Sequence, residues 1–358
     1  MKIKRAFTLV ELLVVIAIIG LLASISIIAL NTARAKSRDA KRVADIKQIS
    51  TALELFFNDM GRYPTALEFA SGSIYSTSSG ATTTYLANIP VAPATPDGDC
   101  TASSNTYSYT SVNNGEKYTL NFCLGGQVSS LTSGATCGTS MGLLSQDCCE
   151  VFPVQYEGGP YDADGMSTTT GGYYRTVKIG DQCWLKDNLN VGTMIAVGAS
   201  QTNNSVTEKY CMNGSAGNCS IYGGIYSREE AIQYNPVAGG QGICPAGWHI
   251  PTDIEQDALD QYLTNSGQVC DGSRINDYSC NGAGTKMKVG GSSGFNAPMA
   301  GASVSGSFIA FGSGGYFWSS TVPYGSVNYG RILLLAGQGT GRYRFGNEYG
   351  LSVRCIRN

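Results

Sequence analysis

The first hydrophobic pattern along the chain is an unbroken apolar run close to its start. From Leu12 to Leu30 the only polar residues are Ser24 and Ser26. In a helix this run would measure about 28 Å, close to the thickness of the hydrocarbon layer of a bilayer. The run therefore predicts a helix that crosses a membrane.

After this run the pattern becomes amphipathic without a break. Apolar residues recur at spacings of three and four, and charged residues occupy the opposite face, as in a helix that covers a core. Gly61 and Pro64 end the pattern. We expect one helix over residues 7–58, with its membrane part at about 8–30. The apolar positions of the amphipathic half are Val43, Ile46, Ile49, Leu53 and Phe56 or Phe57.

Residues 59–150 carry strand and turn patterns. The Ser/Thr/Gly-rich stretch at 71–85 is typical of a flexible surface loop. Residues 106–124 alternate aromatic and polar side chains around Asn114-Gly115, which predicts two antiparallel strands joined by a tight turn. The stretch from Gly125 to Cys149 is typical of a loop, so we place the end of this region near residue 150.

Residues 151–358 are rich in Gly, Tyr and Asn, and their patterns predict short strands and one clear helix. The helix begins at "PTDIEQDALDQYL", where Thr252 and Glu255 have the spacing of a capping box. Its expected apolar face consists of Ile254, Leu259, Tyr262 and Leu263.

Two motifs in this region have both a functional and a structural interpretation. The glycines of "GQGTGRYRFG" follow an apolar stretch, as in a nucleotide-binding loop, but a dinucleotide fingerprint requires a helix next. The following residues alternate like a strand, so we favour a hairpin. Asp162–Gly165 ("DADG") is similar to the start of a calcium loop, yet the third acidic ligand and the distal glutamate are missing. We favour a surface turn there and no cofactor, with calcium as the alternative.

Charge and histidine content limit the function further. Charged residues make up 14% of the chain and the formal net charge is −2, so a basic face for phosphate is lacking and no specific nucleic-acid site is evident. His249 is the only histidine, so any His-based catalysis or two-histidine metal site is excluded or depends on this residue. For His249 we favour a structural hydrogen bond, and we assign no catalytic residue.

The cysteines indicate an oxidising compartment. The chain has twelve, all between Cys100 and Cys355 and none in the membrane region. Zinc is the alternative, but no CxxC is present and the adjacent Cys148–Cys149 is poor ligand spacing. The complete connectivity stays open. Candidate short-loop pairs are Cys100–Cys123, Cys211–Cys219 and Cys270–Cys280.

The N-terminus "KIKRAFTLVELLVVIAIIGLLASI" resembles that of type IV pilins and type II secretion pseudopilins. The resemblance implies that a membrane prepilin peptidase cuts between Ala6 and Phe7 and methylates the new amine of Phe7. The family has glycine before the cut, where this chain has Ala6. The resemblance also implies a small antiparallel sheet that packs on the long helix.

Glu11 lies in this apolar segment and is the expected assembly residue. In the filaments of this family the glutamate meets the N-terminal amine of a neighbouring subunit, here that of Phe7. A carboxylate in lipid is costly unless an opposite charge neutralises it. The alternative is that Glu11 lies at the membrane interface and reaches the headgroups.

The motifs of the C-terminal half occur in the order of the Fibrobacter succinogenes major paralogous domain. They are "YRTVKIGDQCWLKDNLN", "YGGIYSREEAI", "GICPAGWHIPTDIEQDAL", "GGYFWSST" and "GLSVRCIRN". This resemblance, over about residues 160–358, implies a fold related to C-type lectins and formylglycine-generating enzymes. It also suggests a long-range disulfide from Cys355 to Cys183 or Cys244. A catalytic cysteine is the minority alternative.

The last 70 residues have the Tyr, Asn, Ser and Gly content of adaptable binding surfaces, with occasional Trp and Arg. We therefore expect a ligand surface there. Its candidate residues are Tyr316, Tyr324, Asn328, Tyr329, Arg331, Arg342, Tyr343, Arg344, Asn347 and Tyr349.

Together these patterns predict an α+β chain with four parts. They are a leader at 1–6, the pilin helix at 7–58, a pilin-like β region at 59–150, and a lectin-like domain at 151–358. The expected function is non-enzymatic: a structural subunit of a type IV pilus-like filament that displays a binding or adhesion module. The alternative is a minor pseudopilin of a type II secretion or DNA-uptake apparatus, acting as tip or cargo adaptor.

The same interpretation names the partners and the location of the chain. We expect identical or homologous subunits, the prepilin peptidase, and an unknown protein or glycan ligand at the surface. The chain would first span the cytoplasmic membrane once and then join an extracellular filament at the cell surface.

Overall fold

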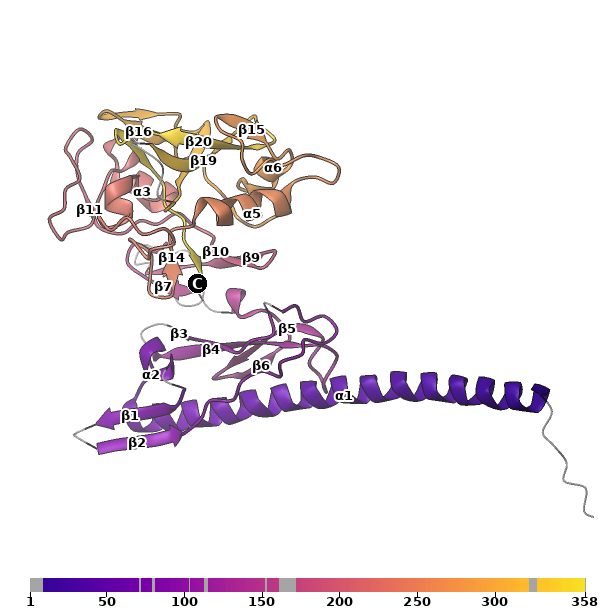
Figure 1. The fold of residues 1–358 in the computed structure, drawn as a ribbon. Coiled ribbons are helices and arrows are strands. Elements are labelled where there is room, and N and C mark those ends of the chain that lie inside the picture. The colour runs from indigo at the N-terminus through magenta and orange to yellow at the C-terminus, as the bar shows by residue number, and fades with distance from the viewer. Residues whose placement is uncertain are drawn as a thin grey trace, which may run out of the picture. The chain divides into compact units, whose positions relative to one another are not determined.

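In the computed structural model, the apolar and amphipathic stretches near the N-terminus form one continuous helix, α1 (Leu9–Met60), of 52 residues (Figure 1). This confirms the single long helix that the sequence pattern predicts. The structure describes residues 9–70, 72–78, 81–102, 104–112, 115–151, 153–160, 172–321 and 327–357. The chain divides into two units, Met1–Cys148 and Cys149–Asn358, each of which has its own core.

The first unit places two groups of antiparallel strands on the C-terminal half of α1 (Figure 1). One is a hairpin and the other a four-stranded sheet with the order β3-β4-β5-β6. The strands are β1 (Ile74–Ser78), β2 (Ala81–Leu86), β3 (Ser108–Val112), β4 (Lys117–Leu124), β5 (Gly134–Thr139) and β6 (Gly142–Leu144). Short helices α2 (Ala66–Ala70) and η2 (Cys148–Glu150) complete the elements described here.

The apolar stripe of α1 forms the core of this unit, as predicted. Ile46, Ile49, Leu53 and Phe56 are fully buried. They pack with a cluster contributed mainly by β4, which includes Leu120 and other apolar residues of that strand. The helix therefore owes its C-terminal half to packing, since an amphipathic helix is stabilised mostly by the face that it buries.

The predicted hairpin at residues 106–124 is confirmed, because β3 and β4 pair from Ser108↔Asn121 to Val112↔Lys117. Asn114 of its expected turn lies outside the described residues. Two loop predictions are wrong. The stretch 71–85 contains β1 and β2, in which Ile74 and Ser76 alternate inward, and the stretch after Gly125 contains β5 and β6. Small polar residues gave these strands the composition of loops.

The second unit contains three four-stranded sheets, with the orders β14-β22-β10-β9, β13-β21-β16-β17 and β15-β20-β19-β18. Two short pairs, β7-β8 and β11-β12, accompany them. The strands are β7 (Val154–Gln155), β8 (Tyr173–Tyr174), β9 (Thr176–Ile179), β10 (Gln182–Leu185), β11 (Thr193–Met194), β12 (Glu208–Lys209), β13 (Tyr226–Ser227), β14 (Trp248–His249), β15 (Asp277–Ser279), β16 (Ala302–Val304), β17 (Ser307–Ile309), β18 (Gly314–Trp318), β19 (Asn328–Leu334), β20 (Thr340–Phe345), β21 (Tyr349–Leu351) and β22 (Ile356–Arg357). The α+β class that the sequence predicts is confirmed.

Antiparallel pairing of β19 and β20 confirms the hairpin at "GQGTGRYRFG". The helices of this unit are η3 (Met212–Gly214), α3 (Ala216–Tyr222), α4 (Arg228–Ala231), α5 (Asp253–Leu263) and α6 (Ala283–Met287). Helix α5 has the predicted capping box: the Thr252 hydroxyl accepts from the Glu255 amide, and the Glu255 carboxylate accepts from the Thr252 amide.

The predicted apolar face of α5 is only half right. Leu259 and Leu263 are buried, but Ile254 is 82% exposed and Tyr262 is 65% exposed. The buried face of α5 instead carries Asp253, Gln256 and Asp260. This helix packs a polar face inward because the sheet beside it presents arginines.

All twelve cysteines form disulfides. Cys100–Cys123, Cys211–Cys219 and Cys270–Cys280 are the three short-loop pairs proposed from sequence. The long-range partner of Cys355 is Cys244, not Cys183. The remaining pairs are Cys137–Cys148 and Cys149–Cys183. No thiol remains free, whereas a catalytic cysteine would need one.

Candidate functional site

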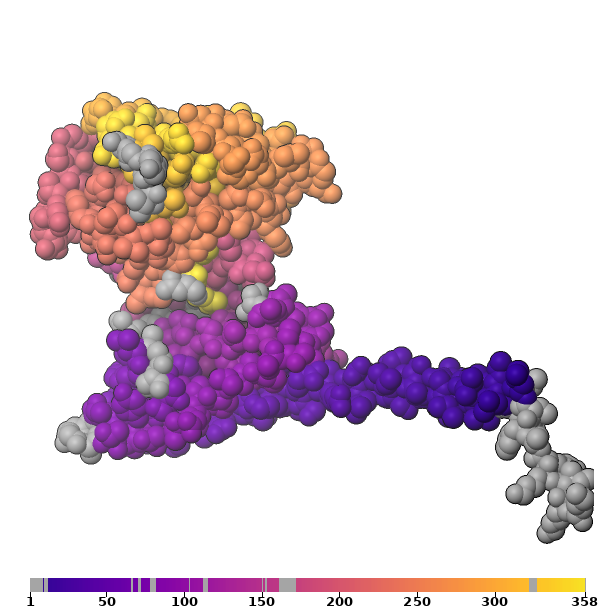
Figure 2. Space-filling view, in the orientation of Figure 1, coloured from indigo at the N-terminus to yellow at the C-terminus, as the bar shows by residue number. Residues whose placement is uncertain are grey.

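The N-terminal half of α1 is the first candidate site. The large apolar side chains between Leu12 and Leu30 are exposed, for example Leu21 at 63% and Ile28 at 67%. Figure 2 shows this half as a bare rod that no other part of its own unit covers. By length and composition it is apolar enough to cross a membrane. Such a surface is unfavourable in water, so it must meet lipid or other helices.

The structure describes only one of the expected processing and assembly residues, Glu11. Ala6 and Phe7 are outside the described residues. Glu11 belongs to the first turns of α1, and its assembly role stays a prediction. The hydroxyls of Ser24 and Ser26 form hydrogen bonds within the helix. Each donates at 2.8 Å to the carbonyl four residues earlier.

Where α1 enters its own unit, charged residues fasten a loop to the helix. Arg42 is fully buried and donates to Asp39 at 2.7 Å and to Asp97 at 3.1 Å. The carboxylate of Asp39 also accepts from the amides of Gly125 and Gly126 at 2.9 Å. The hydrogen bond from Arg38 is the main reason that the pKa of Asp97 lies below its usual range. Two arginines that follow the apolar run are therefore paired with aspartates, Arg42 in the interior and Arg38 at a half-buried position.

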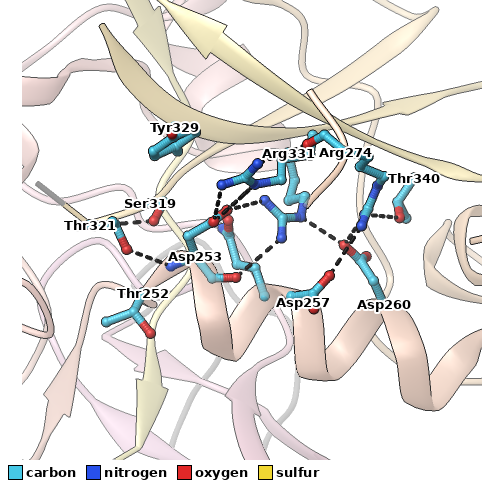
Figure 3. Close-up of polar contacts among 12 residues, drawn as sticks. Thr252, Asp253, Asp257, Asp260, Arg274, Ser319, Thr321, Tyr329, Arg331 and Thr340 are labelled. Atoms are coloured by element: carbon cyan, nitrogen blue, oxygen red, sulfur yellow. Dashed lines mark hydrogen bonds and ion pairs between the residues drawn. The ribbon is translucent and has the colours of Figure 1, made fainter. Parts of the chain in front are cut away.

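In the C-terminal unit, the structure divides the predicted ligand surface into an inner and an outer part. Arg331, Arg342 and Asn328 are buried, so they do not line an exposed surface, and this part of the prediction is wrong. Arg331 points from β19 toward α5, where it meets Asp253 and Asp260 (Figure 3). Arg342 of β20 also donates to Asp253.

The ion pairs of this network join segments far apart in the chain. Asp253 accepts from Arg331 at 2.6 Å and from Arg342 at 2.6 Å. Asp260 accepts from Arg331 at 2.7 Å and from Arg274 at 2.6 Å, and Arg274 also reaches Asp257 at 3.1 Å. Three arginines are thus paired with three aspartates, of which Asp253 and Asp260 are buried and Asp257 is half-buried, as burial of charge requires.

The pKa of Asp253 reflects these partners. Burial alone would raise the pKa of its carboxyl group, but the hydrogen bond from Arg342 and the charge of Arg331 outweigh burial and lower it below its usual range. We interpret the network as structural, because its polar groups are directed at one another and not at solvent.

The other predicted residues are divided between the two faces of the same sheet. Strand alternation places Tyr316 and Tyr343 on the face opposite to Arg331 and Arg342, where both are half-buried and pack against the buried core of the unit. Tyr278 of β15, which sequence reasoning missed, joins them with its ring 5.2 Å from that of Tyr343. Burial raises the pKa of the Tyr278 and Tyr316 hydroxyls, so both are neutral near pH 7.

Tyr329 and Arg344 lie on the same face as Arg331 and Arg342, and Asn347 and Tyr349 follow β20 in the chain. Tyr329 is half-buried, and the guanidinium of Arg342 lies 4.3 Å from its ring centre. Arg344 and Asn347 are exposed, and Tyr349 is half-buried. Tyr324 lies outside the described residues.

Next to Tyr349 a cleft of about 410 Å³ opens between three loops of this unit. These are residues 197–201, the β16–β17 turn at Ser305 and Gly306, and the β20–β21 turn at Asn347 and Glu348. Its volume is within the range of about 300–1,000 Å³ of small-ligand sites. Sequence analysis found two of its residues, Asn347 and Tyr349, but not the loop at 197–201, which has no signal of its own.

Gly350 leaves room at the floor of this cleft. A Cβ atom on this residue would lie 2.4 Å from the Ser303 hydroxyl, closer than side chains approach one another. A larger residue at position 350 would therefore have to move the Ser303 side chain.

His249 has the structural hydrogen bond that we favoured. Its Nε2 lies 2.9 Å from the Glu255 carboxylate, which also completes the capping box of α5. The calcium alternative at Asp162–Gly165 lies outside the described residues. Among the residues that the structure does describe, no group of three or more His, Cys, Asp or Glu side chains is arranged to hold a metal ion.

Comparison with known proteins identifies both ends of the chain. Residues 177–357, half of the chain, match the Fibrobacter succinogenes major domain. Residues 1–27 match the prokaryotic N-terminal methylation motif. No solved structure matches the chain, so the lectin-like character of the second unit stays a prediction.

Curated relatives match a short segment of the chain. Over 60 residues, 17% of this chain and 27% of the relative, the identity to the type IV major pilin protein PilA of Myxococcus xanthus (strain DK1622) is 41%. Over 62 residues the identity to type II secretion system core protein G is 42% in both Escherichia coli (strain K12) and Klebsiella michiganensis. That match covers 17% of this chain and 43% and 44% of the two relatives. The chain thus spans less than half of the length of these relatives.

Proposed function

Because this chain belongs to the family of the Fibrobacter succinogenes major domain and its N-terminal segment is homologous to type IV pilins and to type II secretion protein G, we propose that it is a structural subunit of a type IV pilus-like filament. In this proposal α1 holds the subunit in the cytoplasmic membrane and later in the filament. The C-terminal unit is displayed at the cell surface as a binding module.

The observation that carries the proposal is the exposed apolar half of α1. The part of the chain that the structure describes leaves this half uncovered, since none of the residues in its most apolar stretch is buried. Lipid can cover it before assembly, and the equivalent helices of other copies can do so afterwards. In the second environment Glu11 would need a positive partner, which the methylated amine of Phe7 in a neighbouring copy would supply.

The display role of the C-terminal unit is supported by its covalent construction. Four of its disulfides lie wholly within it, which suits a domain that works in an oxidising environment outside the cell. Its half-buried tyrosines and its cleft are available to a ligand. We propose recognition, not catalysis, for this unit.

The test uses the substitution Glu11→Ala in cells that express the chain. We expect membrane insertion and cleavage before Phe7 to be unchanged, and the yield of sheared filaments to fall at least tenfold. Mass spectrometry of the mature N-terminus should find methylated Phe7 in both proteins. Ser24→Ala is the matched control, because Ser24 only bonds within its own helix, and its filament yield should equal that of the wild type. A normal yield for Glu11→Ala would refute the assembly role.

The second candidate is a minor pseudopilin of a secretion or DNA-uptake apparatus that carries the C-terminal unit as tip or cargo adaptor. The similar identities to a pilin and to protein G, 41% and 42%, favour neither. Abundance separates the two, since a major subunit would dominate sheared filaments and a minor one would be rare in them.

A further inference from the structure

We propose that the cleft beside Tyr349 binds an uncharged oligosaccharide. The inference rests on the proposed function, in which this unit is displayed outside the cell, and it names the class of ligand. The argument depends on the residues that line the cleft, on how they are held, and on the charge that they present.

The groups that line the cleft suit the hydroxyls of a sugar. Gln201, Asn347 and several serines carry groups that both donate and accept hydrogen bonds, and Glu229 and Glu348 accept only. A saccharide offers many hydroxyls that do both, so this mixture can satisfy them. A peptide would instead need apolar pockets or a free strand edge, and the only aliphatic side chains among the described lining residues are those of Val197 and Ala199.

Three tyrosines contribute rings to the same cleft, namely Tyr210, Tyr234 and Tyr349. An aromatic face is an apolar surface on which the C–H face of a sugar ring can pack, while its hydroxyl remains a polar contact. The ring of Tyr349 is oriented by the edge of Phe345, with ring centres 5.3 Å apart. All three tyrosines are half-buried, so each presents part of its surface to the cleft.

The lining is held in place before any ligand arrives. The Tyr210 hydroxyl donates to the Ala199 carbonyl at 2.6 Å, and that of Tyr234 donates to Glu230 at 2.8 Å. The Gln201 side chain accepts from the Ser227 amide at 2.6 Å and donates to the Ile225 carbonyl at 3.2 Å. The two bonds of Gln201 hold the 197–201 loop against β13 and the residue before it. A preorganised site loses less conformational entropy on binding.

The two turns on the other side of the cleft also brace each other. The amide of Ser305 donates to the carbonyl of Glu348 at 3.1 Å, which joins the β16–β17 turn to the β20–β21 turn. The walls of the cleft therefore come from separate loops that are hydrogen-bonded to the sheet or to each other.

The charge of the cleft excludes acidic ligands. Its described lining residues include two glutamates and no lysine or arginine. Arg228 lies 3.5 Å from Glu229 and neutralises that carboxylate in part. The exposed Glu348 remains, and it would repel a carboxylate, sulfate or phosphate on a ligand. A neutral glycan meets no such repulsion.

The test measures binding to the full-length chain in a zwitterionic detergent that has no sugar headgroup. The probes are tetrasaccharides of glucose, mannose, galactose and N-acetylglucosamine, with tetragalacturonate and a heparin tetrasaccharide as acidic probes. By calorimetry we expect at least one neutral probe to bind and both acidic probes to bind at least tenfold more weakly. We expect Tyr349→Ala and Glu348→Gln each to weaken the neutral ligand at least tenfold.

Tyr262→Ala is the matched control, because Tyr262 is an exposed tyrosine of the same unit outside the cleft, and its affinity should equal that of the wild type. Glu348→Gln changes an exposed side chain, so the test does not depend on whether Tyr349→Ala folds. The inference is overturned if no neutral probe binds, if an acidic probe binds more tightly, or if Glu348→Gln binds as the wild type does. Filament assembly is measured separately, so its failure would refute the proposed function and not this result.

Discussion

At the residue scale, the arginines of β19 and β20 show how the same side chain serves a surface or an interior. Arg331 and Arg344 lie on adjacent strands and belong to the same Tyr- and Arg-rich segment. Arg331 is 2% exposed and is held by Asp253 and Asp260, whereas Arg344 is exposed and lies 5.7 Å from the ring centre of Tyr329. Composition does not distinguish them, because only the position of α5 decides which arginine has a carboxylate partner.

This contrast gives a matched pair of substitutions. Arg331→Met should destabilise the C-terminal unit by about 3–5 kcal/mol, because it leaves the buried carboxylate of Asp260 with one partner fewer. Arg344→Met should change stability by less than about 0.5 kcal/mol. All three tryptophans of the chain, Trp184, Trp248 and Trp318, are buried in this unit, so urea unfolding followed by tryptophan fluorescence measures it selectively. Equal midpoints for the two variants would contradict the structural role of the network.

At the element scale, α1 carries two different environments along one helix. Its first half is apolar all round, and its second half combines an apolar stripe with charged residues that bind loops of its own unit. The helical pattern alone predicts that these charged residues face solvent. Some of them are instead buried. Arg42 and Asp39 are buried because the loop at 92–105 and the strand end at Gly125 supply partners.

Removal of one carboxylate should loosen this attachment. Asp97→Asn weakens the hydrogen bonds from Arg38 and Arg42, so we expect hydrogen exchange in residues 92–105 to accelerate at least tenfold at pH 7. Asp99→Asn is the control, because Asp99 is exposed and only two residues away, and its exchange should match the wild type. Wild-type exchange in the Asp97→Asn variant would show that the loop is held without this charge.

The same carboxylate makes the attachment sensitive to acid. The folded pKa of Asp97 is lowered by Arg38, so its contribution to stability is fully present above the ordinary Asp pKa of about 3.9 and is lost as the pH falls through the lowered value. The difference in hydrogen-exchange rate of residues 92–105 between Asp97→Asn and the wild type should therefore become smaller below about pH 4.

At the scale of the whole molecule, the two units are joined at adjacent half-cystines. Cys148 ends the first unit and bonds to Cys137, while Cys149 begins the second and bonds to Cys183. The peptide bond between Cys148 and Cys149 joins the two units, and on each side of it a disulfide links the chain to its own unit. No linker residue lies between these two cysteines.

We expect each disulfide to stabilise only the unit that contains it. Replacing Cys137 and Cys148 together with serine should lower the stability of the first unit by about 2–4 kcal/mol and leave the tryptophan-detected transition unchanged. Replacing Cys149 and Cys183 should do the reverse. Hydrogen exchange followed by mass spectrometry reports both units in one sample. A loss of protection in both units from either double substitution would show that they unfold together.

The sequence by itself determined the features that depend on neighbours along the chain. These are the 52-residue helix, the capping box of α5, the hairpins at β3–β4 and β19–β20, and the short-loop disulfides. Period, cap and turn residues act within a few positions, so a local pattern is sufficient to predict them. The N-terminal methylation motif is also a local pattern, so the sequence alone was sufficient to predict it.

Only the tertiary structure decided which polar residues face inward. Arg331 and Asp253 are 78 residues apart in the chain, and Gln201 and Tyr349 meet at one cleft from loops that share no motif. Two Ser/Gly-rich stretches are strands for the same reason, because neighbouring strands pair with them and α1 packs against them. Burial of a charge or a small polar side chain depends on what another segment places beside it, and a pattern read along the chain contains no information about that segment.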